Sequence, residues 1–98
     1  LITNNTQAVT LTMSQSTYYQ LTNNAITAIS LSLGPIAEGT VGEFICEFIY
    51  NTGNTKPIIT LPTGVKYANG FTSSDYIAGY KYILYIINNI CYVSCVEV

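Results

Sequence analysis

Apolar and polar side chains alternate along most of this 98-residue chain, and this period-two pattern predicts short β-strands. Gly, Asn, Pro and Ser separate the alternating stretches, and no stretch has the 3.6-residue period of a helix. The predicted strands are Ala8–Met13, Tyr18–Thr22, Ile26–Leu33, Val41–Tyr50, Ile58–Leu61, Val65–Tyr67, Gly79–Asn89 with a turn at its end, and Ile90–Val98. We therefore expect one all-β domain over residues 1–98, an antiparallel β-sandwich of jelly-roll type with about eight short strands.

The stretch Gly79–Asn89, GYKYILYIINN, is apolar on both sides of the predicted strand. One side is an ordinary core face, whereas the other carries a single lysine followed by Ile83, Tyr85 and Ile87. Antiparallel sheets usually keep one face in water, so a strand that is apolar on both sides needs a cover on both sides. The opposite sheet supplies one cover, and we expect a second copy of the chain to supply the other.

Other strands add positions to this predicted interface. Along Val41–Tyr50, two isoleucines alternate with Glu43 and Glu47 on one face, which suits a contact with the glutamates at its rim. In the alternative, Lys81 or Lys66 pairs with one of these glutamates, and both arrangements can coexist; such surface pairs contribute only about 0–1 kcal/mol. The predicted oligomer interface consists of Tyr19, Ile45, Ile49, Ile83, Tyr85 and Ile87.

Composition narrows the functional classes. Only 8% of the residues are charged, whereas about 25% is usual, and the net charge is −2 with three lysines and no arginine. A nucleic-acid partner calls for a clustered basic surface, so none is expected. No apolar run approaches the length of a membrane helix and no signal peptide is visible, so no membrane insertion is expected either. Because the chain begins at Leu1, we expect it to be part of a longer protein.

The chain offers little catalytic chemistry. It has no histidine, and Glu43 and Glu47 lie about 13 Å apart by strand rise, whereas glycosidase carboxyl groups lie roughly 5–10 Å apart. We expect no enzyme, no catalytic residue, no cofactor and no metal site. The cysteines Cys46, Cys91 and Cys95 are expected to be reduced, buried thiols, although Cys46 could pair with either of the others.

Tyrosine is abundant, with nine copies, and supplies the contact area and hydroxyl groups that binding surfaces use. Several tyrosines flank the loop region 64–79 together with amide and carboxylate side chains. Such a set could hold a sugar. The candidate ligand-binding residues are Tyr67, Asn69, Asp75, Tyr76 and Tyr80. In the alternative, Tyr67 fills the core beneath a turn and the other two tyrosines cover strand edges.

Two stretches, ITLPTGVKYAN at 59–69 and IAGYKYILYIINN at 77–89, carry a family resemblance. They resemble a small β-domain near the C-terminus of bacteriophage appendage proteins, such as tail fibres, head fibres and baseplate-associated proteins. The family pattern is Leu-Pro, then Gly-Val-Lys-aromatic-Ala-Asn-Gly, then Ala-Gly and a tyrosine-centred strand that ends in Asn. The match covers about a third of the chain. It departs at Tyr67, where the family often has Trp, and at Ile83 and Tyr85, which are more apolar than usual.

This resemblance implies a non-enzymatic structural domain of the virion, assembled in the host cytoplasm and often homotrimeric. It would form or cap a fibre or another appendage and would contact its own copies and other virion proteins. The alternative is a carbohydrate-binding tip that attaches the same appendage to a host-surface glycan.

Overall fold

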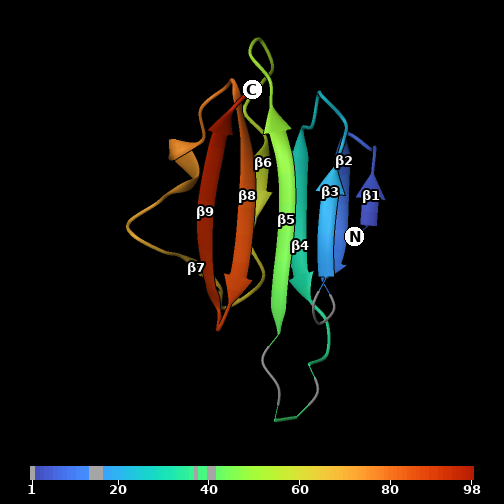
Figure 1. The fold of residues 1–98 in the computed structure, drawn as a ribbon, viewed down its shortest axis with the longest axis vertical. Helices are drawn as coiled ribbons and strands as arrows, with labels where there is room; N and C mark the ends of the chain where they lie inside the picture. The colour runs from blue at the N-terminus through green and yellow to red at the C-terminus, as the bar shows by residue number, and fades with distance from the viewer. Residues whose placement is uncertain (1, 14–16, 37, 40–41) are drawn as a thin grey trace.

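The computed structural model describes residues 2–13, 17–36, 38–39 and 42–98, which form two β-sheets packed face to face (Figure 1). The expectation of an all-β fold is confirmed. The predicted strand start at Val41 and the turn expected at residues 14–16 lie outside the described residues.

The described residues contain nine strands and one short 3-10 helix, η1, and the ends of the predicted strands shift by only one or two residues. The strand at the N-terminus and η1 lie in segments for which the pattern predicted no regular structure. The elements are β1 (Ile2–Asn4), β2 (Ala8–Met13), β3 (Thr17–Leu21), β4 (Ala28–Leu33), β5 (Glu43–Tyr50), β6 (Ile58–Thr60), β7 (Lys66–Tyr67), η1 (Ser73–Asp75), β8 (Tyr80–Ile87) and β9 (Ile90–Glu97).

The large sheet has the strand order β1-β3-β5-β8-β9-β7, and the small sheet has the order β2-β4-β6. From β1 to β6 the chain passes alternately between the two sheets, and each strand pairs in parallel with the strand two places before it. This is a solenoid-like connection, in which a strand of the opposite sheet serves as the crossover that parallel pairing requires.

The expectation of an antiparallel jelly roll was wrong for most of the molecule. Only β5–β8 and β8–β9 pair antiparallel in the described residues. The physical reason is that side chains alternate in the same way in parallel and antiparallel strands, so the pattern carries no information on direction. Direction is readable only where a tight turn joins two strands.

In the part of the chain that the structure describes, Asn88-Asn89 is such a turn, between β8 and β9. Both asparagines have positive φ, 53° and 60°, the left-handed conformation that a two-residue hairpin of this hand demands and that Asn tolerates. Strands β8 and β9 pair over eight residues on either side of it. The predicted hairpin is confirmed.

The core lies between the sheets. Alternate residues of β2 and β4 meet those of β5 and β8, and Leu84, Ile29 and Met13 are completely buried. Tyr82, Leu84 and Ile86 form the predicted core face of β8.

The cysteines only partly follow the expectation. Cys46 and Cys91 are buried, and burial raises the pKa of each to about 12, so both thiols are protonated at neutral pH. Cys95 is exposed, which corrects its assignment to the core, and all three cysteines are free. Cys95 has the same strand parity as the buried Cys91, but it lies near the end of β9, where the side chains are exposed.

The large sheet extends past the small one, with β9 and β7 lying beyond β6 (Figure 1). The segment between β7 and β8 covers the inner face there with aromatic rings. The Tyr76 ring lies 5.0 Å from Phe71 and 4.9 Å from Tyr82, measured between centroids, and Tyr76 is only 2% exposed. These rings take the place of further strands in the small sheet.

Candidate functional site: the outer face of the large sheet

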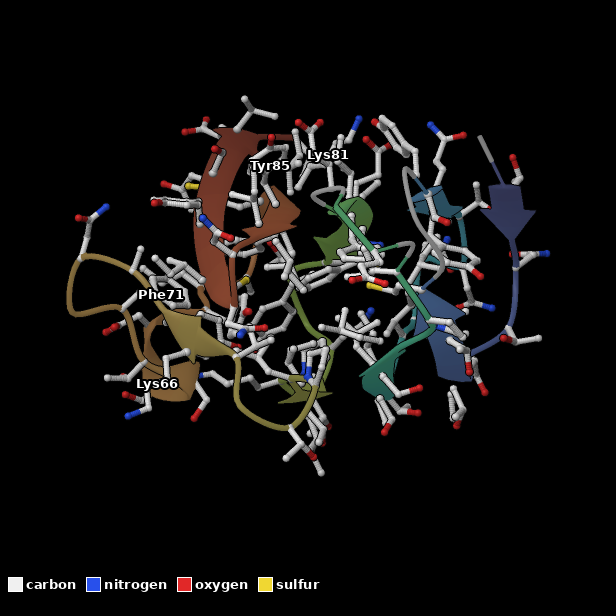
Figure 2. All side chains as sticks on the ribbon, turned by 90° about the horizontal axis from the view of Figure 1, so that it is seen from below. Lys66, Phe71, Lys81 and Tyr85 are labelled. Carbon is white, nitrogen blue, oxygen red and sulfur yellow. The ribbon has the colours of Figure 1, made fainter. Side chains whose placement is uncertain are left out.

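The outer face of the large sheet consists of side chains from β3, β5, β8 and β9 that point away from the small sheet. The pairing registers place them in rows across the strands, and one row is Tyr18, Ile45, Tyr85 and Tyr92. Tyr85 and Lys81 stand on this side in Figure 2. The full set is Tyr18, Gln20, Glu43, Ile45, Glu47, Ile49, Lys81, Ile83, Tyr85, Ile87, Ile90, Tyr92, Ser94 and Val96.

No strand or helix of the described residues lies over this face (Figure 2). Its central side chains, such as Ile45 and Ile83, are half-buried. Toward the β9 side the apolar groups open to solvent, with Ile90 37%, Tyr92 41% and Val96 55% exposed. The chain therefore does not hide this surface with its own described elements.

The predicted interface residues fall on this face with one exception. Ile45, Ile49, Ile83, Tyr85 and Ile87 all lie on it. Tyr19 lies on the opposite side of β3, packs against the core and donates a hydrogen bond from its hydroxyl to the Thr12 carbonyl oxygen at 3.1 Å. Its neighbour Tyr18 takes its place on the outer face.

A polar cluster interrupts the apolar rows at Glu47. This residue is 3% exposed although it belongs to an outward-facing row. Its carboxylate accepts hydrogen bonds from the Tyr18 hydroxyl, from Gln20 Nε2 at 2.9 Å and from Lys81 Nζ at 3.1 Å. The alternative that paired Lys81 with a glutamate of β5 is confirmed, whereas Lys66 lies on the far edge strand β7.

The electrostatics of this cluster favour an ionised Glu47. Burial by itself would raise the pKa of Glu47, but the hydrogen bonds from Tyr18, Gln20 and Lys81 outweigh it and hold the pKa below its usual value. The same contact raises the pKa of the Tyr18 phenol, first through its hydrogen bond to Glu47 and then through burial. The cluster carries one negative and one positive charge, so the apolar face around it can be desolvated without burying a net charge.

A small cavity of about 230 Å³ opens beside this cluster, lined by Gln20, Leu21, Thr22, Glu47, Phe48, Ile49 and Lys81. Its carboxylate and ammonium groups are already paired with each other. Among the described residues no group of three His, Cys, Asp or Glu side chains could hold a metal ion. Within the same residues no helix is long and apolar enough to cross a membrane.

The candidate ligand-binding residues do not converge on one open site. Tyr76 is in the core, and its hydroxyl lies 2.9 Å from that of Tyr67. The Asp75 carboxylate accepts a hydrogen bond from the Thr72 backbone N–H at 2.7 Å and caps η1. Asn69 occupies a turn position with φ 58°, and the Tyr80 ring packs near Tyr82.

The pattern anticipated the pairing of Lys81 with a glutamate of β5, but it did not reveal that Tyr18 and Gln20 join this cluster, or the role of Phe71. Phe71 packs 5.1 Å from the Tyr67 ring, although it lies in a segment that reads as a polar loop. A signal for the cluster existed in the strand registers, because Gln20 and Glu47 are paired neighbours on β3 and β5. The register cannot be obtained from one sequence when both strands alternate equally well.

No family model, curated protein or solved structure matches this chain.

Proposed function

We propose that this chain is a non-enzymatic structural domain that assembles with copies of itself through the outer face of the large sheet. The observation that carries this proposal is the set of apolar rows on that face, which no described element covers. Monomeric proteins rarely expose large contiguous apolar patches, and such patches mark interaction sites. The interior of a subunit interface is apolar and aromatic, as are the rows through Ile45, Tyr85 and Tyr92.

The charge distribution supports self-association. Among the described residues, Lys81 and Glu47 form an ion pair within the face, so two such faces can meet without a like-charge contact at that point. Of the remaining outer-face residues, only Glu43 is acidic, and it stands at one end of β5, where a rim residue would remain in water.

The proposed setting is an appendage of a bacteriophage virion, where the domain forms or caps a homotrimer. This part rests on the resemblance of the stretches 59–69 and 77–89 to phage appendage domains. An assembly role needs no catalytic residue, in keeping with a chain that contains no histidine.

Sedimentation equilibrium over a range of protein concentrations tests the proposal. We expect a mass of three times the 10.7 kDa of one chain. A mass of one chain at every concentration would contradict self-assembly, and a stable dimer would retain the interface but reject the trimer.

A further inference from the structure

The small sheet ends at β6 with a free edge. Strand β6 pairs with β4, and no other described strand pairs with it. Ile58 N–H donates to the Thr27 carbonyl oxygen at 3.0 Å, so Ile58 and Thr60 turn their backbone groups toward β4. Backbone groups of alternate residues point to opposite sides of a strand, so the N–H and C=O of Ile59 face away from the sheet.

An open groove of about 570 Å³ lies beside this free edge. It is lined by Ile59, Thr60, Leu61, Val65, Lys66, Tyr67, Phe71 and Ser73. Tyr67 and Phe71, both half-buried, contribute aromatic rings, and the other apolar groups come from β6 and the turn that follows it. This volume is in the range of about 300–1,000 Å³ that is common for ligand sites.

The position of the groove is that of the missing fourth strand of the small sheet. Lys66 belongs to β7, the edge strand of the large sheet; in Figure 2 it stands at the level of the small sheet, and Phe71 lies between that level and the rest of the large sheet. The large sheet continues past β6 with β9 and β7, so a strand added at β6 would have an inner face to pack against.

Two prolines limit what the edge can pair with. Pro57 and Pro62 bracket the segment Ile58–Leu61 and have no backbone N–H to donate. Prolines and short strands prevent extended edge-to-edge pairing in native sheets. The free edge is therefore restricted to a short partner strand.

The charge beside the groove is positive. The Lys66 ammonium forms no hydrogen bond or ion pair within the part of the chain that the structure describes. Nearby, Lys56 Nζ donates to the Ser74 carbonyl oxygen at 2.9 Å, and the Asp75 carboxylate is engaged with Thr72. A partner segment with an acidic side chain would complement Lys66.

We propose that the groove beside β6 binds a short extended peptide segment of another protein, which pairs with the backbone of Ile59 as an added strand of the small sheet. Strand addition combines main-chain hydrogen bonds at a free edge with pockets for alternate side chains. The segment has apolar residues at alternate positions, which enter between β6 and the Tyr67 and Phe71 rings. It has an acidic residue at the end nearest Lys66.

The test uses four acetylated, amidated hexapeptides, with Val, Ile, Leu or Phe at the two alternate apolar positions, Thr between them and Glu at the end. Each is titrated into the amide-labelled protein and followed by NMR. At least one peptide shifts the signals of Ile59, Tyr67 and Phe71 in a saturable way. Methylation of its backbone nitrogens at alternate positions weakens binding about tenfold or more, because the main-chain hydrogen bonds are lost.

Variants of the protein separate strand pairing from other binding. Ile59→Pro removes the N–H that faces the groove and also replaces a side chain that packs against the core, and we expect binding to weaken about tenfold or more. Ile58→Thr is the matched control, since that side chain points outward and is 70% exposed, and it leaves binding unchanged. If Ile59→Pro does not fold, the N-methylated peptides supply the comparison for strand pairing, and Phe71→Ala tests the side-chain contacts of the groove. Lys66→Glu weakens binding of the Glu peptide, and a peptide with Lys in place of Glu restores it.

Three results would overturn the proposal. The first is that none of the four peptides shifts the groove signals. The second is that N-methylated and unmodified peptides bind equally. The third is that oligosaccharides, added as a mixture of neutral and acidic chains, shift Ile59 and Phe71 while the peptides do not.

Discussion

The two outer faces of the molecule differ, although both belong to sheets that share one core. The outer face of the large sheet presents rows of Ile and Tyr. The outer face of the small sheet presents mainly hydroxyl groups, with Thr10, Ser30 and Thr60 in one row and Thr12 and Ser32 in the next; the row at its other end, Ala8, Ala28 and Ile58, is apolar. Inner positions must be apolar in both sheets, so only the outer positions indicate whether a face contacts water or another protein surface.

The small sheet's face is suited to water. Thr12 Oγ1 lies 3.3 Å from Ser32 Oγ, and β-branched Thr also favours the extended backbone. On the described part of the large sheet's outer face, the polar groups outside the Glu47 cluster are Glu43 at one end, Ser94 on β9 and the hydroxyls of Tyr85 and Tyr92. Strand alternation predicts the core of both sheets, whereas the composition of the outer positions separates a hydroxyl-rich face from an apolar face, and we propose that the apolar face contacts other copies of the chain.

The largest expected effect comes from placing a carboxylate on each face. Ile83→Glu would bury an unpaired charge in the interface, which costs about 3 kcal/mol or more. We expect association to weaken by roughly two orders of magnitude. Ser30→Glu, the matched change on the small sheet, leaves the mass unchanged. Equal masses for the two variants in sedimentation equilibrium would abolish the distinction between the faces.

A smaller effect is expected from the ion pair. Lys81→Met leaves the Glu47 carboxylate buried without its cation, and because Lys81 is one-third exposed we expect a loss of about 1–3 kcal/mol in the free energy of unfolding. Urea titration measures it. Lys66→Met, which removes no hydrogen bond or ion pair within the described residues, serves as the control. If both variants unfold at the same urea concentration as the parent, the cluster does not stabilise the fold.

The pH dependence follows from the lowered pKa of Glu47. A carboxyl group with a depressed pKa in the folded state stabilises the protein above its unfolded pKa of about 4.3 and loses this contribution as the pH falls through its folded value. We expect stability to fall on acidification below about pH 4–5, and Glu47→Gln to show a shallower fall. The measurement is the urea midpoint of both proteins between pH 7 and pH 3. If the midpoint falls equally steeply with pH in the parent and in Glu47→Gln, Glu47 does not cause the loss of stability.

The smallest effect is expected on the small sheet's outer face. Thr12→Ala removes an exposed hydroxyl contact, and we expect the free energy of unfolding to change by no more than about 0.5 kcal/mol. A loss above about 1 kcal/mol, seen in urea titration without any change in the mass of the assembly, would mean that this face also makes a contact that stabilises the fold.

Strand positions were predictable because alternation acts locally. The core face of β8 and the turn at Asn88-Asn89 follow from residue parity and from the tolerance of Asn for positive φ. The solenoid-like pairing of β1 to β6 was not predictable, since it depends on which strands meet after long connections. A single sequence does not show directly which distant strands pair.

Site residues could be predicted from the sequence where the alternation within a single strand assigns them to one face. Ile83, Tyr85 and Ile87 could be assigned from β8 alone. Tyr19 was misplaced because two adjacent tyrosines do not say which points inward; Leu21, of the same parity and 2% exposed, marks the inner side. The Glu47 cluster depends on pairing of β3 with β5, and burial of Tyr76 depends on how a loop packs.

The central claim is that copies of the chain cover the outer face of the large sheet. The most direct measurement is NMR of the assembled protein with a dissolved, non-binding paramagnetic gadolinium chelate, which broadens signals of atoms that solvent reaches. The account predicts that Ile45, Ile83 and Tyr85 side chains remain sharp, while Thr10, Thr12 and Ser30 are broadened. Equal broadening of both sets would show that the face lies open to water and would contradict the account.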